Sequence, residues 1–253
     1  SRMRLKSGIS MWSPWPASAV CDAQEHHMAG CAARRRHHRR RDLPDAVGAG
    51  RARKGRAGGE HRATFRKLGH DAWSCDVLPA EDGSPYHIQD DVLGCLYGVW
   101  DLAIFHPPCT RLTVAGARWF KGREQEQAEA IAFVERLWNC GIPRIAIENP
   151  VSIISSRIRK PDQIIQPYHF GHDASKKTCL WLKGLPPLRP TAFVDPRIVD
   201  GKPRWANQTD SGQNKLAPSD DRWKLRSKTY SGIANAMAEQ WSKYLLTCAS
   251  GCA

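Results

Sequence analysis

Two short apolar runs, each ended by a proline-containing turn, constrain the fold of this chain more than any other feature. Residues 100–105 are mostly apolar and stop at a His-Pro-Pro turn. Residues 144–147 form the second run, which stops at Glu-Asn-Pro. Short apolar runs bounded by turn residues are typical of the buried strands of a parallel sheet. We therefore expect two neighbouring parallel strands.

The segment between these runs has the pattern of an amphipathic helix. From Ala128 to Leu137, apolar residues recur at spacings of three and four within a predicted helix over residues 124–140. Gly141 ends this pattern. A strand, a helix and a second strand in this order make a right-handed parallel crossover, so the chain is predicted to be an α/β protein.

The same reasoning predicts the elements on either side of the crossover. A short helix is expected to end at Gly69, and an apolar strand over residues 72–75 closes on Asp76. The other predictions are a short strand near residues 86–88, a strand over 178–182, a proline-rich turn over 184–190, a polar loop over 195–221 and a final helix over 233–246.

Residues 1–58 differ in composition from the rest of the chain. They lack a sustained apolar period and contain an Arg/His run at 34–41. Of the net charge of +13, residues 1–69 hold +11 (16 Lys and Arg against five Asp and Glu), which leaves +2 for the remainder. Such a segment buries too little apolar surface to offset the entropy of ordering. We expect a disordered basic leader over 1–58, which either contacts phosphates or is simply solvated, an α/β domain over 59–246 and a tail over 247–253.

Cysteine usage and hydropathy exclude two classes of protein. The nine cysteines include no Cys-x-x-Cys pair, and no apolar run approaches the roughly 18 residues needed to cross a bilayer. A disulfide scaffold and a membrane protein are therefore not expected, and a reducing cytoplasmic location without export fits best. The cysteines and histidines between Cys21 and His38 match no zinc-binding spacing, so we expect no metal.

The two proline-containing turns place reactive side chains at the ends of the predicted strands. Cys109 follows two prolines that stiffen its backbone, and Glu148 ends the second run. Ligands of open parallel sheets bind beyond the carboxyl ends of the strands, so we expect Cys109 and Glu148 to lie together there. A thiolate near a helix N-terminus has a lowered pKa and is a nucleophile. Glu148 would serve as an acid or orienting group, and Asn149 would hold an amide edge of the substrate. The alternative is a small buried cysteine and a carboxylate that caps a helix.

On these residues the chain resembles the DNA cytosine-5 methyltransferase family, above all its short phage-type members. The Pro-Cys motif of the family matches Pro108-Cys109, and its Glu-Asn motif matches Glu148-Asn149, with Pro150 where better-known members have Val. The resemblance implies a Rossmann-like S-adenosylmethionine-dependent methyltransferase sheet with flanking helices. It also implies that Cys109 adds to C6 of a cytosine in DNA, that Glu148 stabilises protonation at N3, and that C5 takes the methyl group without a metal.

Weaker matches imply where S-adenosylmethionine and DNA bind. Asp76 stands where the family places an acidic residue for the ribose, Asp91 resembles the acidic turn for the adenine, and Asn235 belongs to a segment that opens the last helix beside the cofactor. The glycine-rich turn of the family is matched only around Gly59, and no strand precedes it. We therefore expect the first strand to be missing or replaced, which would leave a sheet edge. The candidate DNA contacts are Arg111, Lys176 and Lys177.

Two other functions remain open. The turn that contains Cys109 also resembles the Asp/Asn-Pro-Pro-aromatic turn of amino-group DNA methyltransferases, which need neither a thiol nor the Glu-Asn motif. The unmatched first motif, in turn, favours a non-catalytic or decayed nucleic-acid-binding homologue. Covalent trapping of DNA by Cys109 and binding of S-adenosylhomocysteine distinguish these functions.

Overall fold

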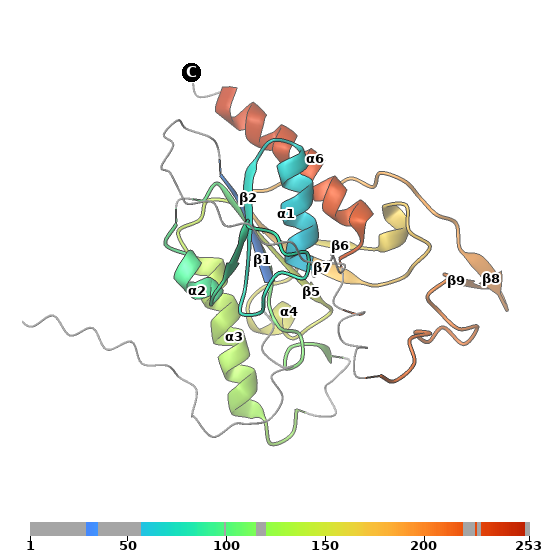
Figure 1. Cartoon of the computed structure of the whole chain (residues 1–253). Helices are drawn as coiled ribbons and strands as arrows, with labels where there is room; N and C mark the ends of the chain where they lie inside the picture. The colour runs from blue at the N-terminus through green and yellow to red at the C-terminus, as the bar shows by residue number, and fades with distance from the viewer. Residues whose placement is uncertain are drawn as a thin grey trace, which may run out of the picture.

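A computed structural model describes residues 29–34, 57–98, 100–114, 120–219, 226 and 229–250 (Figure 1). Its centre is a seven-stranded sheet in the order β3-β2-β1-β4-β5-β7-β6. The strands are β1 (Ala29–Arg34), β2 (Asp71–Asp76), β3 (His87–Gln89), β4 (Leu102–His106), β5 (Ile145–Pro150), β6 (Gln163–Ile165) and β7 (Thr178–Lys183).

The sheet is mixed. Strands β2 and β3 are parallel, and so are β4 and β5, whereas β1 runs antiparallel to both β2 and β4. Strand β7 is antiparallel to β5 and β6. The carboxyl ends of β2, β3, β4, β5 and β6 therefore all lie at one edge of the sheet.

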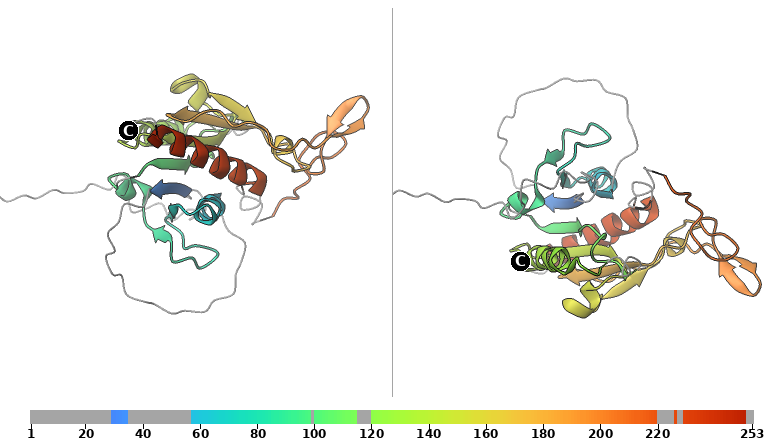
Figure 2. Two further views of the ribbon diagram at one scale, coloured as in Figure 1. Left: turned by 90° about the horizontal axis from the view of Figure 1, so that it is seen from above. Right: turned by 90° about the horizontal axis from the view of Figure 1, so that it is seen from below.

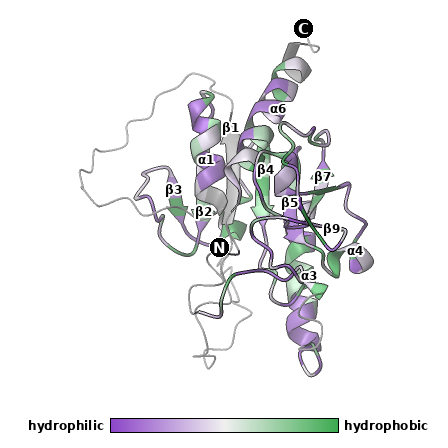
Figure 3. Ribbon diagram, turned by 90° about the vertical axis from the view of Figure 1, so that its right-hand side faces the viewer, coloured by the Kyte–Doolittle hydropathy of each residue, from purple (hydrophilic) through white to green (hydrophobic). Residues whose placement is uncertain are grey.

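Helices cover both faces of the sheet. One face packs α1 (Ala57–Lys67) and α6 (Ser231–Ser250), which lie side by side in Figure 1. The other face packs α2 (Val92–Cys95), α3 (Glu124–Asn139) and α4 (Ile154–Arg157). In Figure 3, hydrophilic and hydrophobic residues alternate around α3, as in a helix with one side against a sheet.

Alternation along the central strands divides the core into two layers. Ile104 and Ala146 belong to the cluster beneath α1 and α6, and Phe105 and Ile147 belong to the cluster beneath α3. Because side chains alternate between faces, the residues after Phe105 and Ile147, His106 and Glu148, lie on the α1 side.

Most predicted elements are confirmed within one or two residues. Helix α3 spans nearly all of 124–140, and the crossover from β4 to β5 is parallel as expected. Strand β5 continues through Glu148 to Pro150, because it pairs with β7 as far as Thr178, so Glu148 lies within the strand and not in a turn after it.

The expectations for the leader and for the late loop need correction. Residues 29–34 of the leader form β1, so the expected sheet edge is absent: β1 fills the space between β2 and β4. The rest of the leader up to residue 56 lies outside the described residues. Residues 195–221 were predicted to be loop, but they contain a hairpin of β8 (Arg197–Val199) and β9 (Lys202–Arg204), which projects from the sheet in Figure 2. A 3₁₀ turn, η2 (Pro167–His169), precedes β7.

Hydropathy along the described helices is too low for a membrane span. None of them combines the length and the apolar character that crossing a bilayer requires.

Candidate strand-end site

The register of β4 and β5 sets the geometry of the site. Phe105 pairs with Ile147, so His106 and Glu148 follow side by side at the carboxyl edge of the sheet. The Nδ1 atom of His106 lies 3.5 Å from Oε2 of Glu148. Cys109 follows His106 after two prolines, and its carbonyl accepts bonds from the amides of Leu112 and Thr113. Cys109 and Glu148 are thus carried by neighbouring parallel strands, as predicted.

Asn149 fastens the turn that carries Cys109. Its side-chain nitrogen donates to the carbonyl of Pro107 at 2.9 Å, and the residue is only 1% exposed. Pro108 stands between Pro107 and Cys109 in the sequence and is half-buried. The side-chain nitrogen of Asn149 therefore holds the protein's own backbone, while its Oδ1 atom has no hydrogen-bond partner in the described part of the chain.

Two opposing effects set the pKa of Cys109. Burial raises the pKa of this thiol above its ordinary value, and the charges of Arg226 and Lys176, which lower the pKa, offset that rise only in part. The expected lowering by a helix N-terminus is not found: the pKa is raised, and within the described residues up to 114 the thiol is followed by a turn that closes on the Cys109 carbonyl. Formation of the thiolate therefore depends on these two cations.

Lys176 lies at the centre of the site's electrostatics and not on the open surface. Burial lowers its pKa, and the charges of Glu148 and Cys109 raise it. Its Nζ atom lies 6.0 Å from the centre of the Tyr230 ring. One cation thus acts on both the thiol and the carboxylate.

The other two predicted DNA contacts lie in different environments. Arg111 donates from Nε to Oε2 of Glu126 at 2.5 Å, so its charge is used within the protein. Lys177 is exposed. Only Lys177 therefore retains the surface character expected of a phosphate contact.

The residues expected to bind the cofactor lie on four different elements or turns. Asp76 ends β2 at the strand-end edge and is buried, with Oδ1 accepting from the Leu78 amide. Asp91 caps α2 through the Leu93 amide. Gly59 lies inside helix α1, so the expected glycine turn is not formed there, and Asn235 lies on the exposed side of α6.

Two histidines of this site were not singled out from the sequence. His61 of α1 is fully buried and stacks on His106, with ring centroids 5.1 Å apart. Burial lowers the pKa of each imidazole to about 3. His61 precedes buried Phe65 by four residues, so the two lie on the same side of a helix. His106 follows buried Ile104 by two residues, so the two lie on the same face of a strand. These spacings could have predicted on which face each histidine lies.

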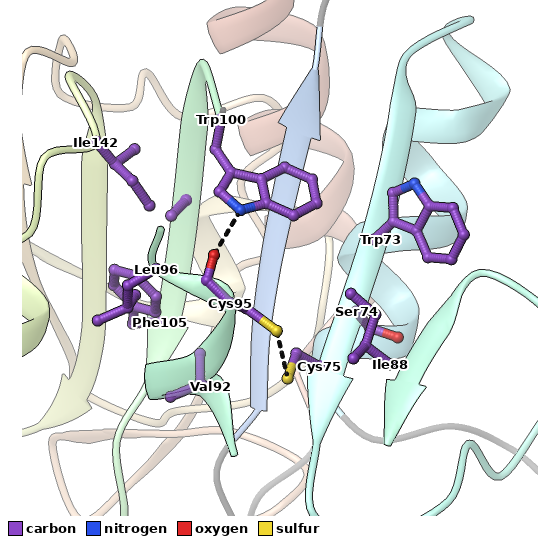
Figure 4. Close-up of a pocket in the computed structure, with 11 residues that line it drawn as sticks. Trp73, Ser74, Cys75, Ile88, Val92, Cys95, Leu96, Trp100, Phe105 and Ile142 are labelled. Carbon is purple, nitrogen blue, oxygen red and sulfur yellow. Dashed lines mark hydrogen bonds between the residues drawn. The ribbon is translucent and has the colours of Figure 1, made fainter. Parts of the chain in front are cut away.

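A separate apolar pocket lies between the sheet and α2 (Figure 4). It is lined by side chains from β2, α2 and the start of β4, among them Cys75, Val92 and Trp100. The sulfur atoms of Cys75 and Cys95 lie 3.4 Å apart there, and the Trp100 indole donates to the Cys95 carbonyl at 2.8 Å. Its walls contain none of the predicted site residues, so it belongs to the core under α2.

No family model, no curated protein and no solved structure matches this chain significantly.

Proposed function

We propose that this chain is a DNA cytosine C5 methyltransferase-like enzyme in which Cys109 is the nucleophile. One observation carries the proposal: Cys109 follows β4, Glu148 lies in the parallel neighbour β5, and Lys176 acts electrostatically on both. The strand directions also favour it, because the carboxyl ends of β4 and β5 meet at this edge and open α/β sheets bind ligands beyond the carboxyl ends of their strands.

The described residues supply a route for covalent addition to cytosine. The Cys109 thiolate, favoured by Lys176 and Arg226, forms a bond to C6. The electron pair of the C5–C6 double bond moves to C5 while N3 is protonated beside Glu148. After C5 has taken the methyl group, its proton passes to solvent water and the electrons of the C5–H bond re-form the C5–C6 double bond. The sulfur leaves C6 as the Cys109 thiolate, and N3 returns its proton beside Glu148. A base in duplex DNA has to be flipped out first, at a cost of roughly a few kcal/mol.

The cofactor half of the site is only partly matched. S-adenosylmethionine would supply the methyl group, and Asp76 offers a buried carboxylate at the end of β2 for its ribose. No glycine-rich turn follows a strand in the described ranges, since Gly59 is helical and β1 runs in the reverse direction. The thiol half of the reaction is therefore the part that these residues support.

Two modified oligonucleotides test the two halves separately. A 2-pyrimidinone base lacks the amino group and accumulates the thiol adduct without methyl transfer. A 5-fluorocytosine base is trapped only after methyl transfer, because fluorine does not leave as the C5 proton does. We expect a denaturation-resistant complex with 2-pyrimidinone DNA that Cys109→Ser abolishes and Cys140→Ser retains. Absence of the complex with the unaltered protein contradicts the proposal.

The 5-fluorocytosine complex, formed with S-adenosylmethionine present, reports the complete reaction. Trapping on both oligonucleotides supports an active methyltransferase. Trapping on 2-pyrimidinone DNA alone would mean that Cys109 adds to the base but that the protein does not transfer a methyl group. Methylation of an exocyclic amino group that survives Cys109→Ser would instead identify the amino-group enzyme.

A further inference from the structure

Three metal-binding side chains from different elements meet at the carboxyl edge of the sheet. His61 of α1, His106 of β4 and Glu148 of β5 each offer one ligand atom, and these atoms all lie within 4.8 Å of one another. The two imidazole rings are stacked with an interplanar angle of 16°. His61 and His106 have no task in the proposed thiol chemistry, so their burial at this place needs another explanation.

Four polar atoms of this cluster have no hydrogen-bond partner in the protein. In the described part of the chain, both ring nitrogens of His61, Nε2 of His106 and Oε2 of Glu148 are buried without a hydrogen bond. Leaving a buried polar atom unpaired costs about 1–3 kcal/mol, and such atoms in native proteins usually face an ordered water or ion.

We propose that His61, His106 and Glu148 form a binding site for a divalent transition metal ion of the zinc type. Two imidazoles and one carboxylate are a donor set that zinc and iron accept, with a remaining position for water. Ligands bound at zinc–ligand distances of 2.0–2.2 Å stand roughly 3–3.5 Å apart, so the widest separation in the cluster, up to 4.8 Å, closes by roughly 1–2 Å on binding.

The metal site and the proposed methyltransferase chemistry share one residue, Glu148. Glu148 cannot hold a metal ion and assist a cytosine at the same time. The metal-loaded protein is therefore expected to lose trapping of 2-pyrimidinone DNA, and a chelator is expected to restore it. If the protein binds no metal, the metal site is contradicted, but metal-free protein can still trap 2-pyrimidinone DNA. The two proposals are therefore tested by separate measurements.

Metal binding is tested on the full chain, purified without a histidine tag and stripped with a chelator. Zinc affinity and stoichiometry are measured by competition with a chromophoric chelator, and Co²⁺ is added to look for the visible absorption of a tetrahedral site. We expect one equivalent of zinc per chain. His61→Gln and His106→Gln should each weaken this affinity by at least about 10-fold.

Two control variants separate this site from other histidines of the chain. His169→Gln removes a half-buried histidine elsewhere in the described fold, and the pair His37→Gln/His38→Gln removes two from the basic leader. Both controls should keep the zinc affinity of the unaltered protein, and circular dichroism verifies that each variant is folded. Equal zinc affinity in His61→Gln overturns the proposal, as does loss of binding in the leader variant alone, which would place the metal in the leader.

Discussion

Glu148 and Asn149 are adjacent in sequence but serve opposite faces of the sheet. Strand alternation directs Glu148 toward His106 and His61 beneath α1, whereas Asn149 donates to Pro107 on the other side. The residue types of the Glu-Asn motif were visible in the sequence, but this division was not. It depends on β5 continuing past Ile147, which its pairing with β7 dictates.

Asn149 is expected to position Cys109 through the Pro107 carbonyl. Asn149→Asp keeps the size of the side chain but removes the donor, leaving a buried acceptor unpaired at a cost of about 1–3 kcal/mol. We expect lower stability in urea and, per folded molecule, slower trapping of 2-pyrimidinone DNA. An unchanged trapping rate per folded molecule would reduce Asn149 to a purely structural role.

His61 and His106 are expected to couple folding to pH. Burial lowers both pKa values from 6.5 to about 3; the charge of Glu148 opposes this at His61, and Lys176 adds to it at His106. In the unfolded chain the two histidines are protonated below about pH 6.5, whereas in the folded chain they are protonated only below about pH 3. Stability is thus fully present above pH 6.5 and is lost as the pH falls toward 3.

Urea titrations of metal-free protein across this range measure the effect. Two histidines predict a loss of up to about 2.7 kcal/mol in the free energy of unfolding per pH unit. His61→Gln should reduce this slope by about half, whatever it does to stability at pH 7. A slope equal to that of the unaltered protein would show that His61 is protonated in the folded state.

Helix α6 begins in close contact with the segment before β7. The Gly232 amide donates to Nε2 of His172 at 2.9 Å, and a Cβ atom at Gly232 would lie 1.9 Å from the Phe170 carbonyl oxygen. Only a residue without a side chain permits this approach. The last helix itself was predictable from its 3.6-residue period, but the contact that fixes its start was not, because it joins segments 60 residues apart.

Gly232→Ala is expected to lower the free energy of unfolding by about 1–3 kcal/mol, the usual cost of overpacking. Gly141→Ala is the matched control, since a Cβ there meets no atom within 4 Å. Thermal melts of the two variants provide the comparison. Equal melting temperatures would mean that α6 shifts away from Phe170 freely.

Strand β1 determines how the whole sheet closes. It joins the half made of β2 and β3 to the half that begins with β4, pairing with both neighbours along most of its length. Its sequence, Ala-Gly-Cys-Ala-Ala-Arg, lacks the β-branched and aromatic residues that mark strands. Local pattern therefore revealed the crossover from β4 to β5 but gave no sign of this strand, whose place depends on two long-range ladders.

Loss of β1 is expected to destabilise the entire fold, although the sequence predicted that the whole leader is disordered. Ala32→Pro removes a ladder donor from the middle of a central strand and should cost at least about 1–3 kcal/mol. Ala46→Pro, elsewhere in the leader, is the control and should leave the thermal transition little changed. If Ala32→Pro melts like the unaltered protein, β1 contributes nothing to the sheet.

The direction of β1 also separates two chemical properties of the molecule. The chain enters the sheet at Ala29 beside His106 and leaves it at Arg34 beside Asp71, at the opposite edge. The arginine run that continues from Arg34 therefore starts roughly 17 Å, the length of five strand residues, from the edge that carries the thiol. Arg34 and the turn that carries Cys109 thus lie at opposite ends of the sheet.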